Sequence, residues 1–93
     1  MNHLLYLFGA NGAMEHWINS ELLIPPVAIV RKSPNKVTIT TNYMHIEARV
    51  ARTSAGIDDF RGMEPHMVFA HESFFKVCPK ARLILDMLRY RVR

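Results

Sequence analysis

The spacing of apolar residues predicts a helix near each end of the chain. Over residues 12–23, one stripe at helical spacing carries Met14, Trp17, Ile18 and Leu22. Pro25 and Pro26 then end this helix, because proline cannot donate a backbone hydrogen bond. The second helix follows Pro79, a residue suited to a first helical position. Its apolar face comprises Ala81, Ile84, Leu85, Leu88 and Val92.

Strands are predicted between these helices. Residues 27–31 are a short β-branched run, and 33–35 (Ser-Pro-Asn) have the composition of a turn. Residues 36–41 and 45–51 alternate apolar and polar side chains, which predicts a β-hairpin. The apolar run from Met67 to Ala70 predicts a buried strand. Gly9-Ala10-Asn11-Gly12 is interpreted as a turn leading into the first helix.

The elements predict one small domain over residues 1–93. Its class is α/β or α+β, with a mixed sheet of three to four strands and a helix at each end. An apolar fraction of 49% against 22% charged residues argues against disorder. We expect no membrane contact and a cytoplasmic location, since the apolar runs are short and the start lacks a basic signal-peptide region. The single cysteine, Cys78, fits a reducing compartment.

The net charge of +4 is concentrated in two segments. Residues 31–57 carry five basic residues against Glu47, and residues 80–93 carry five against Asp86, so each segment has a net charge of +4. Such segments favour weak, sequence-independent contact with double-stranded DNA. The alternative is a solvated basic surface, or arginines that complement a helix dipole. The candidate contact residues are Arg31, Lys32, Lys36, Arg49, Arg52, Arg89, Arg91 and Arg93.

The most informative stretch runs from Arg61-Gly62 through the eight residues Met63–Ala70 to His71-Glu72, with Phe74-Phe75 following. Before it come a hairpin with Asn42 and residues 46–48, and a loop with Ser54-Ala55. Over roughly residues 15–88, this order resembles the Walker B half of the ATPase domain of large terminase subunits. These are the DNA-packaging motors of tailed phages and herpesviruses.

The resemblance implies a fragment or relic of a packaging ATPase, located inside a host cell if viral. Glu72 would be the catalytic glutamate that polarises a water, with Arg61 and Gly62 near the nucleotide. His71 stands where the family has the aspartate that helps to hold Mg²⁺, and imidazole is a poor ligand for that ion. No GxxxxGK[ST] phosphate-binding loop is present.

We therefore expect no cofactor for the chain alone, with ATP and Mg²⁺ bound only if a partner chain completes the site. An exposed sheet edge, where the missing strand belongs, favours self-association or another protein partner. The alternative function is a small basic assembly or nucleic-acid-binding subunit of a larger complex.

Simpler interpretations accompany these residues. Glu72 can cap the segment that follows it, and Asp58-Asp59 fit a solvated loop better than paired acid-base chemistry. A zinc site of His66, His71, Glu72 and Cys78 is disfavoured, because strand residues five apart, or adjacent, point to opposite faces. We expect no metal site. We also expect the final helix to lie on the apolar strand, with Ile84 against Val68.

Overall fold

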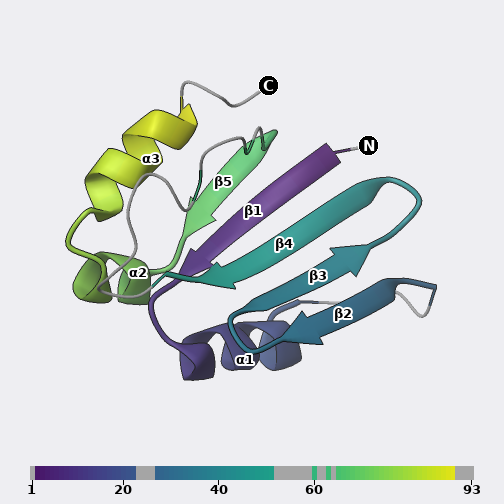
Figure 1. Cartoon of the computed structure of the whole chain (residues 1–93). Coiled ribbons are helices and arrows are strands. Elements are labelled where there is room, and N and C mark those ends of the chain that lie inside the picture. The colour runs from purple at the N-terminus through teal and green to yellow at the C-terminus, as the bar shows by residue number, and fades with distance from the viewer. Residues whose placement is uncertain (1, 23–26, 52–59, 61–62, 64, 90–93) are drawn as a thin grey trace.

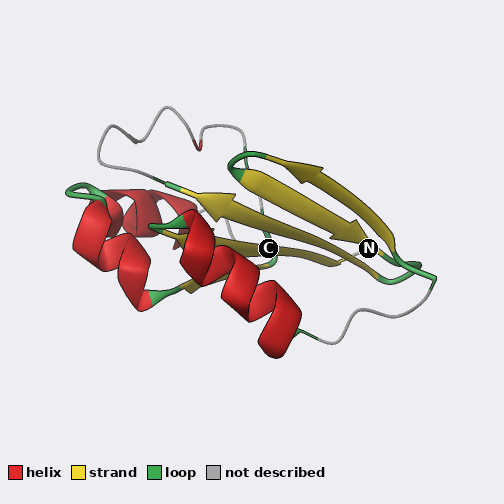
Figure 2. Ribbon diagram, turned by 90° about the horizontal axis from the view of Figure 1, so that it is seen from below, coloured by secondary structure: helices red, strands yellow, loops and turns green. Residues whose placement is uncertain are grey.

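The computed structural model describes residues 2–22, 27–51, 60, 63 and 65–89. In these ranges the chain forms one five-stranded sheet and three helices that pack against it (Figure 1, Figure 2). The predicted α/β class is confirmed. The elements in chain order are β1 (Asn2–Phe8), α1 (Asn11–Ser20), β2 (Ile29–Ser33), β3 (Lys36–Thr40), β4 (Met44–Val50), β5 (Met67–Ala70), α2 (Glu72–Val77) and α3 (Ala81–Arg89).

The sheet combines an antiparallel meander with a parallel centre. Its strand order is β2-β3-β4-β1-β5. Strands β2, β3 and β4 follow one another as antiparallel neighbours, and the pairing of β3 with β4 is the hairpin that the alternating pattern predicted. Strand β1 lies parallel to both β4 and β5. The amino-terminal strand therefore joins two parts of the chain that are distant in sequence.

Strand β1 was not among the predicted elements, and it raises the number of strands to five. Its five consecutive apolar residues, Leu4 to Phe8, show no alternation. A parallel strand covered on both faces needs no alternation, because both sets of side chains are buried. Leu5 and Leu7 point to one face of the sheet, and Phe8 points to the other. Helix α2 was also missed, since its six residues are too few for a periodic signal.

Two apolar clusters form on opposite faces of the sheet. On the first face, the predicted stripe of α1 packs on β3, β4 and β1 through Met14 and Ile18. On the second face, Leu5 and Leu7 meet α2 and α3, with Phe74 and Ile84 fully buried. Val68 packs against this second cluster, which confirms its predicted position beside Ile84.

Helices α2 and α3 contact β1 and β5, and none of the described helices covers the second face of β2, β3 and β4. We call the uncovered area the open face. Because side chains alternate along a strand, the predicted polar positions of the meander all point to it. The open face therefore presents the polar half of three neighbouring strands.

The position of β5 corrects the expectation of a buried strand. It is the last strand in the sheet order, and its side chains on the α1 side remain accessible, with Met67 51% and Phe69 37% exposed. Only the side chains that face α3, Val68 and Ala70, are covered. The apolar run predicted burial on both faces. Helix α1 lies over the other half of the sheet, so it does not cover the side chains of β5 that point to its face. Among the described residues, no helix combines the length and apolar character needed to span a membrane.

Candidate functional site

The strand register arranges the polar residues of the open face in rows. Cross-strand partners lie side by side, so one side chain from each strand contributes to a row. The three rows are Ser33-Lys36-Arg49, Arg31-Thr38-Glu47 and Ile29-Thr40-His45-His3. The open face thus brings cations, hydroxyl groups and imidazoles from four strands into one area.

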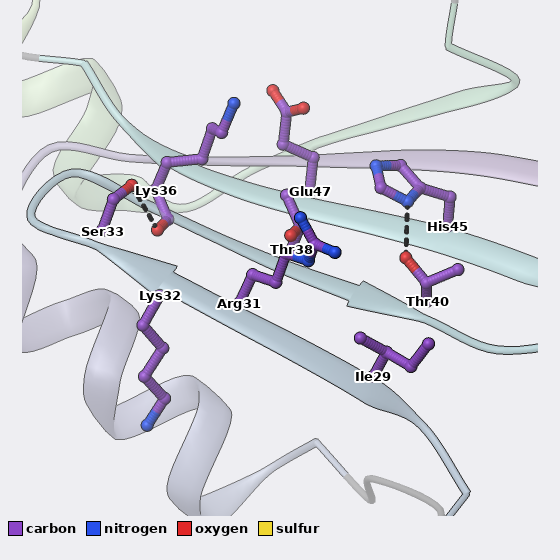
Figure 3. Close-up of a pocket in the computed structure, with 9 residues that line it drawn as sticks. All are labelled: Ile29, Arg31, Lys32, Ser33, Lys36, Thr38, Thr40, His45 and Glu47. Carbon is purple, nitrogen blue, oxygen red and sulfur yellow. Dashed lines mark hydrogen bonds between the residues drawn. The ribbon is translucent and has the colours of Figure 1, made fainter.

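A hollow of about 550 Å³ lies on this face. Arg31, Lys36, Thr38 and Thr40 line it, and Figure 3 shows their positions along β2 and β3. The side chain of Lys32 points away from this group (Figure 3), since its partner Val37 belongs to the α1 face. The positive charge of the hollow therefore comes from side chains at alternate strand positions, which point to the same face of the sheet.

Arg49, the cross-strand partner of Lys36 on β4, is held by several contacts. Its Nε lies 3.6 Å from the Glu47 carboxylate, and its guanidinium lies 5.2 Å from the centre of the Phe60 ring. Its Nη1 also donates to the Met63 sulfur at 3.3 Å. Among the described residues, this surface therefore carries three cations, Arg31, Lys36 and Arg49, and one carboxylate, Glu47.

Of the predicted nucleic-acid contacts, the structure brings together Arg31, Lys36 and Arg49. Lys32 lies on the opposite face. The backbone of Arg89 ends α3, but its side chain is outside the description, as are Arg52, Arg91 and Arg93. A continuous surface that includes both basic segments therefore stays a prediction.

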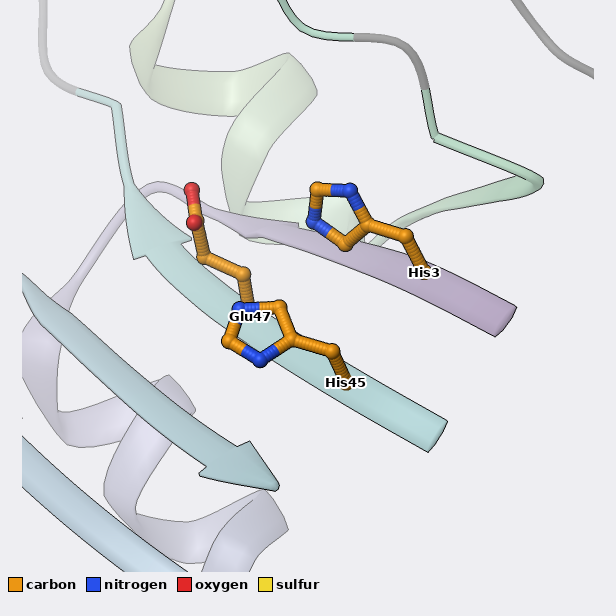
Figure 4. A group of neighbouring side chains, drawn as sticks. All are labelled: His3, His45 and Glu47. Atoms are coloured by element: carbon orange, nitrogen blue, oxygen red, sulfur yellow. The ribbon is translucent and has the colours of Figure 1, made fainter. Parts of the chain in front are cut away.

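A compact polar cluster lies at one end of the open face (Figure 4). His3 on β1 is the direct partner of His45 on β4, and Glu47 follows two residues later on the same face of β4. The nearest ligand atoms of these three side chains all lie within 4.8 Å of one another. The two imidazole rings meet edge to face, with their centres 5.2 Å apart.

Hydrogen bonds hold the ring of His45 and the backbone of His3. The Thr40 hydroxyl lies 2.9 Å from Nδ1 of His45. The backbone N–H of His3 donates to Nδ1 of His66 at 2.9 Å. Burial lowers the pKa of His3, with neighbouring His45 and His66 acting in the same direction and Glu47 opposing them. The His3 ring is therefore neutral at pH 7, although it lies near a carboxylate.

Sequence reasoning did not identify this cluster. The sequence shows that His45 and Glu47 are two residues apart on a strand and so point to the same face. His3 joins them only through the parallel register of β1 and β4. The disfavoured zinc set is not assembled: His66 precedes β5 and His71 follows it, and Cys78 is buried in the second cluster. Within the described residues, the only group of three or more potential metal ligands is His3, His45 and Glu47. The expectation of no metal site stays a prediction, and this group is the arrangement that would contradict it.

The residues of the terminase resemblance lie elsewhere, at the carboxyl end of β5. Glu72 is exposed in the first turn of α2. His71 is the N-cap of that helix, and its side chain accepts a hydrogen bond from the Ser73 N–H at 3.1 Å. Arg61 and Gly62 lie outside the described residues, as do Ser54, Ala55, Asp58 and Asp59.

Residues 9–12, which follow β1, were predicted to form a turn that leads into a helix. Helix α1 does begin at Asn11. The amide of Gly9 donates to the Ser73 hydroxyl at 2.9 Å. The start of α2 thus takes the amide that would face a phosphate in a phosphate-binding loop.

Comparison of the chain with known protein families, with characterised proteins and with solved structures finds no match. The function is therefore inferred from the site itself.

Proposed function

We propose that the protein binds nucleic acid through the open face of β2, β3 and β4. The observation that carries the proposal is the convergence of Arg31, Lys36 and Arg49, from three neighbouring strands, on one uncovered face. Clustered Lys and Arg side chains on one surface provide the electrostatic footprint of a polyanion-binding protein.

The chemistry of the hollow suits a phosphate backbone. Arginine donates in a planar fork that matches phosphate oxygens, and lysine supplies a compact positive charge. The hydroxyls of Thr38 and Thr40 add neutral donors between these cations. Such contacts position a nucleic acid but carry no sequence information. The proposed activity is therefore weak binding without sequence preference.

The salt dependence of binding tests this proposal. The affinity for a labelled DNA duplex should fall with salt, with a slope of about −0.9 for each phosphate neutralised. Replacing Arg31 and Lys36 by Gln should weaken binding and flatten the slope by about 0.9 for each contact removed. Fluorescence anisotropy at increasing salt concentration measures both effects.

Lys32→Gln provides a matched control, because it removes the same charge from β2 but on the other face. It should leave the slope nearly unchanged. Equal effects of Lys32→Gln and Arg31→Gln would assign binding to net charge rather than to the open face. Absence of duplex binding at about 50 mM salt, where phosphate contacts are strong, would refute the proposal.

A segment of a DNA-packaging ATPase is the second candidate. Glu72 favours it, since it follows a strand parallel to β1, and ligands of open α/β sheets bind outside the carboxyl ends of strands. In this proposal a partner chain supplies the phosphate-binding loop. The accessible β5 edge, with Met67 and Phe69 exposed, offers a place for a partner or a second copy.

This second candidate predicts that the isolated chain binds no ATP. The Gly9 amide is occupied by Ser73, and His71 is engaged as a helix cap. Isothermal titration with ATP and Mg²⁺ should give no measurable heat of binding. Tight binding that is lost in Glu72→Gln but retained in Glu15→Gln, an exposed acid on α1, would contradict this expectation and indicate a complete nucleotide site.

A further inference from the structure

We propose that His3, His45 and Glu47 bind a divalent transition-metal ion such as Zn²⁺. The backbone places the three side chains together. His3 and His45 are partners on adjacent parallel strands, and Glu47 lies two positions further along β4, on the same face. Two imidazoles and one carboxylate form a common ligand set for zinc. This site goes beyond the proposed nucleic-acid binding and does not depend on it.

The distances fit a site that closes around an ion. The ligand atoms lie within 4.8 Å of one another. Zinc–ligand bonds of about 2.0–2.2 Å in a tetrahedral site place the donor atoms roughly 3.3–3.6 Å apart. Side-chain rotations that move the donor atoms by about 1 Å would bring them to that separation. The backbone pairing of β1 and β4 would stay as it is.

An unsatisfied nitrogen points to a missing ligand. Nε2 of His3 is buried and has no hydrogen-bond partner among the described residues. A buried polar atom without a partner is costly, and in folded proteins such an atom often contacts a bound water or ion.

Neighbouring residues supply the outer contacts typical of a metal site. If Nδ1–H of His45 donates to the Thr40 hydroxyl, Nε2 of His45 is left as the metal ligand. His66 anchors the backbone of His3. Arg49 lies on one oxygen of Glu47, at 3.6 Å, which leaves the other oxygen for the ion. Neighbouring residues thus contact the side chains of His45 and Glu47 and the backbone of His3.

The nitrogen donors favour zinc-like ions over Mg²⁺ or Ca²⁺, which prefer oxygen ligands. Three protein ligands leave one position of a tetrahedral ion for an exchangeable ligand. Because His45 and Glu47 also line the hollow, the proposed site lies beside it. A water molecule or a phosphate oxygen has the chemistry to fill it.

Calorimetric titration of tag-free, chelator-treated protein with ZnCl₂, without nucleic acid, tests the proposal. We expect one Zn²⁺ per chain. His45→Ala should weaken binding by at least about 100-fold, since even the loss of an outer contact costs about 10–100-fold. Glu47→Gln should also weaken it, because it removes the anionic ligand with little change in shape.

His16→Ala is the matched control, because His16 is exposed on α1 and remote from the cluster. It should leave Zn²⁺ affinity unchanged. Circular dichroism of each variant separates loss of a ligand from loss of the fold. If His45→Ala fails to fold, the Co²⁺-substituted wild type and Glu47→Gln decide the question through their visible absorption spectra. No uptake of Zn²⁺ by the wild type, or uptake that persists in folded His45→Ala and Glu47→Gln, would overturn the proposal.

Discussion

Replacing Phe74 by alanine is expected to lower the free energy of unfolding by about 3–5 kcal/mol. Phe74 lies on α2 with no exposed surface, in the cluster that joins α2 and α3 to β1. Removing its ring deletes buried contacts and leaves a cavity, and both effects destabilise the folded state. Urea denaturation followed by circular dichroism measures the difference.

The adjacent residue provides the control. Phe75 belongs to the same helix but is 47% exposed. Phe75→Ala removes the same kind of ring and makes the same change in helix propensity. It should lower the free energy of unfolding by less than about 1 kcal/mol, as surface substitutions usually do. Similar losses for the two variants would show that α2 is not docked on β1 as described.

Gly9→Ala is expected to destabilise the protein by about 3 kcal/mol, at the upper end of the usual cost of overpacking. A Cβ atom built on Gly9 would lie 2.0 Å from the backbone oxygen of Ser73. That atom belongs to the first turn of α2 and cannot rotate away, so the helix itself would have to shift. The shift would also disturb the hydrogen bond from the Gly9 amide to the Ser73 hydroxyl.

Gly12→Ala makes the same chemical change three residues later. A Cβ atom there meets nothing within 4 Å, and Gly12 lies in α1. Alanine should therefore stabilise the helix, by up to about 1 kcal/mol. Thermal unfolding of both variants should show shifts of opposite sign. A neutral Gly9→Ala would mean that the close approach of α2 to the end of β1 does not exist.

The meander and the long helices could be predicted because their apolar residues recur at a regular spacing in the sequence. Val37, Ile39 and Ile46 alternate with polar residues, and the same alternation fixes which side chains reach the open face. Strand β1 could not be recognised in this way, since a strand buried on both faces has no period. The edge position of β5 depends on the sheet order, which local patterns do not encode.

The candidate site was only partly accessible to sequence reasoning. Two basic segments were evident from the charge pattern. Adjacent strand residues point to opposite faces, however, so the side chains of Arg31 and Lys32 lie on different sides of the sheet. The pairing of His3 with His45 joins residues from distant parts of the chain, and only the register of β1 against β4 reveals it. Glu72 was singled out by its spacing from Arg61-Gly62, and its role stays a prediction.

The central position of β1 has a consequence for how the protein is made. Strand β1 leaves the ribosome before its partners, which begin at Met44 and Met67. The β2–β3–β4 meander closes through short turns, whereas β1 must wait for long loops to close, at a greater entropic cost. Leu5 and Leu7 stay uncovered until α2 and α3 have been synthesised. During translation, β1 is therefore an exposed apolar strand until the later segments that pair with it and cover it have emerged.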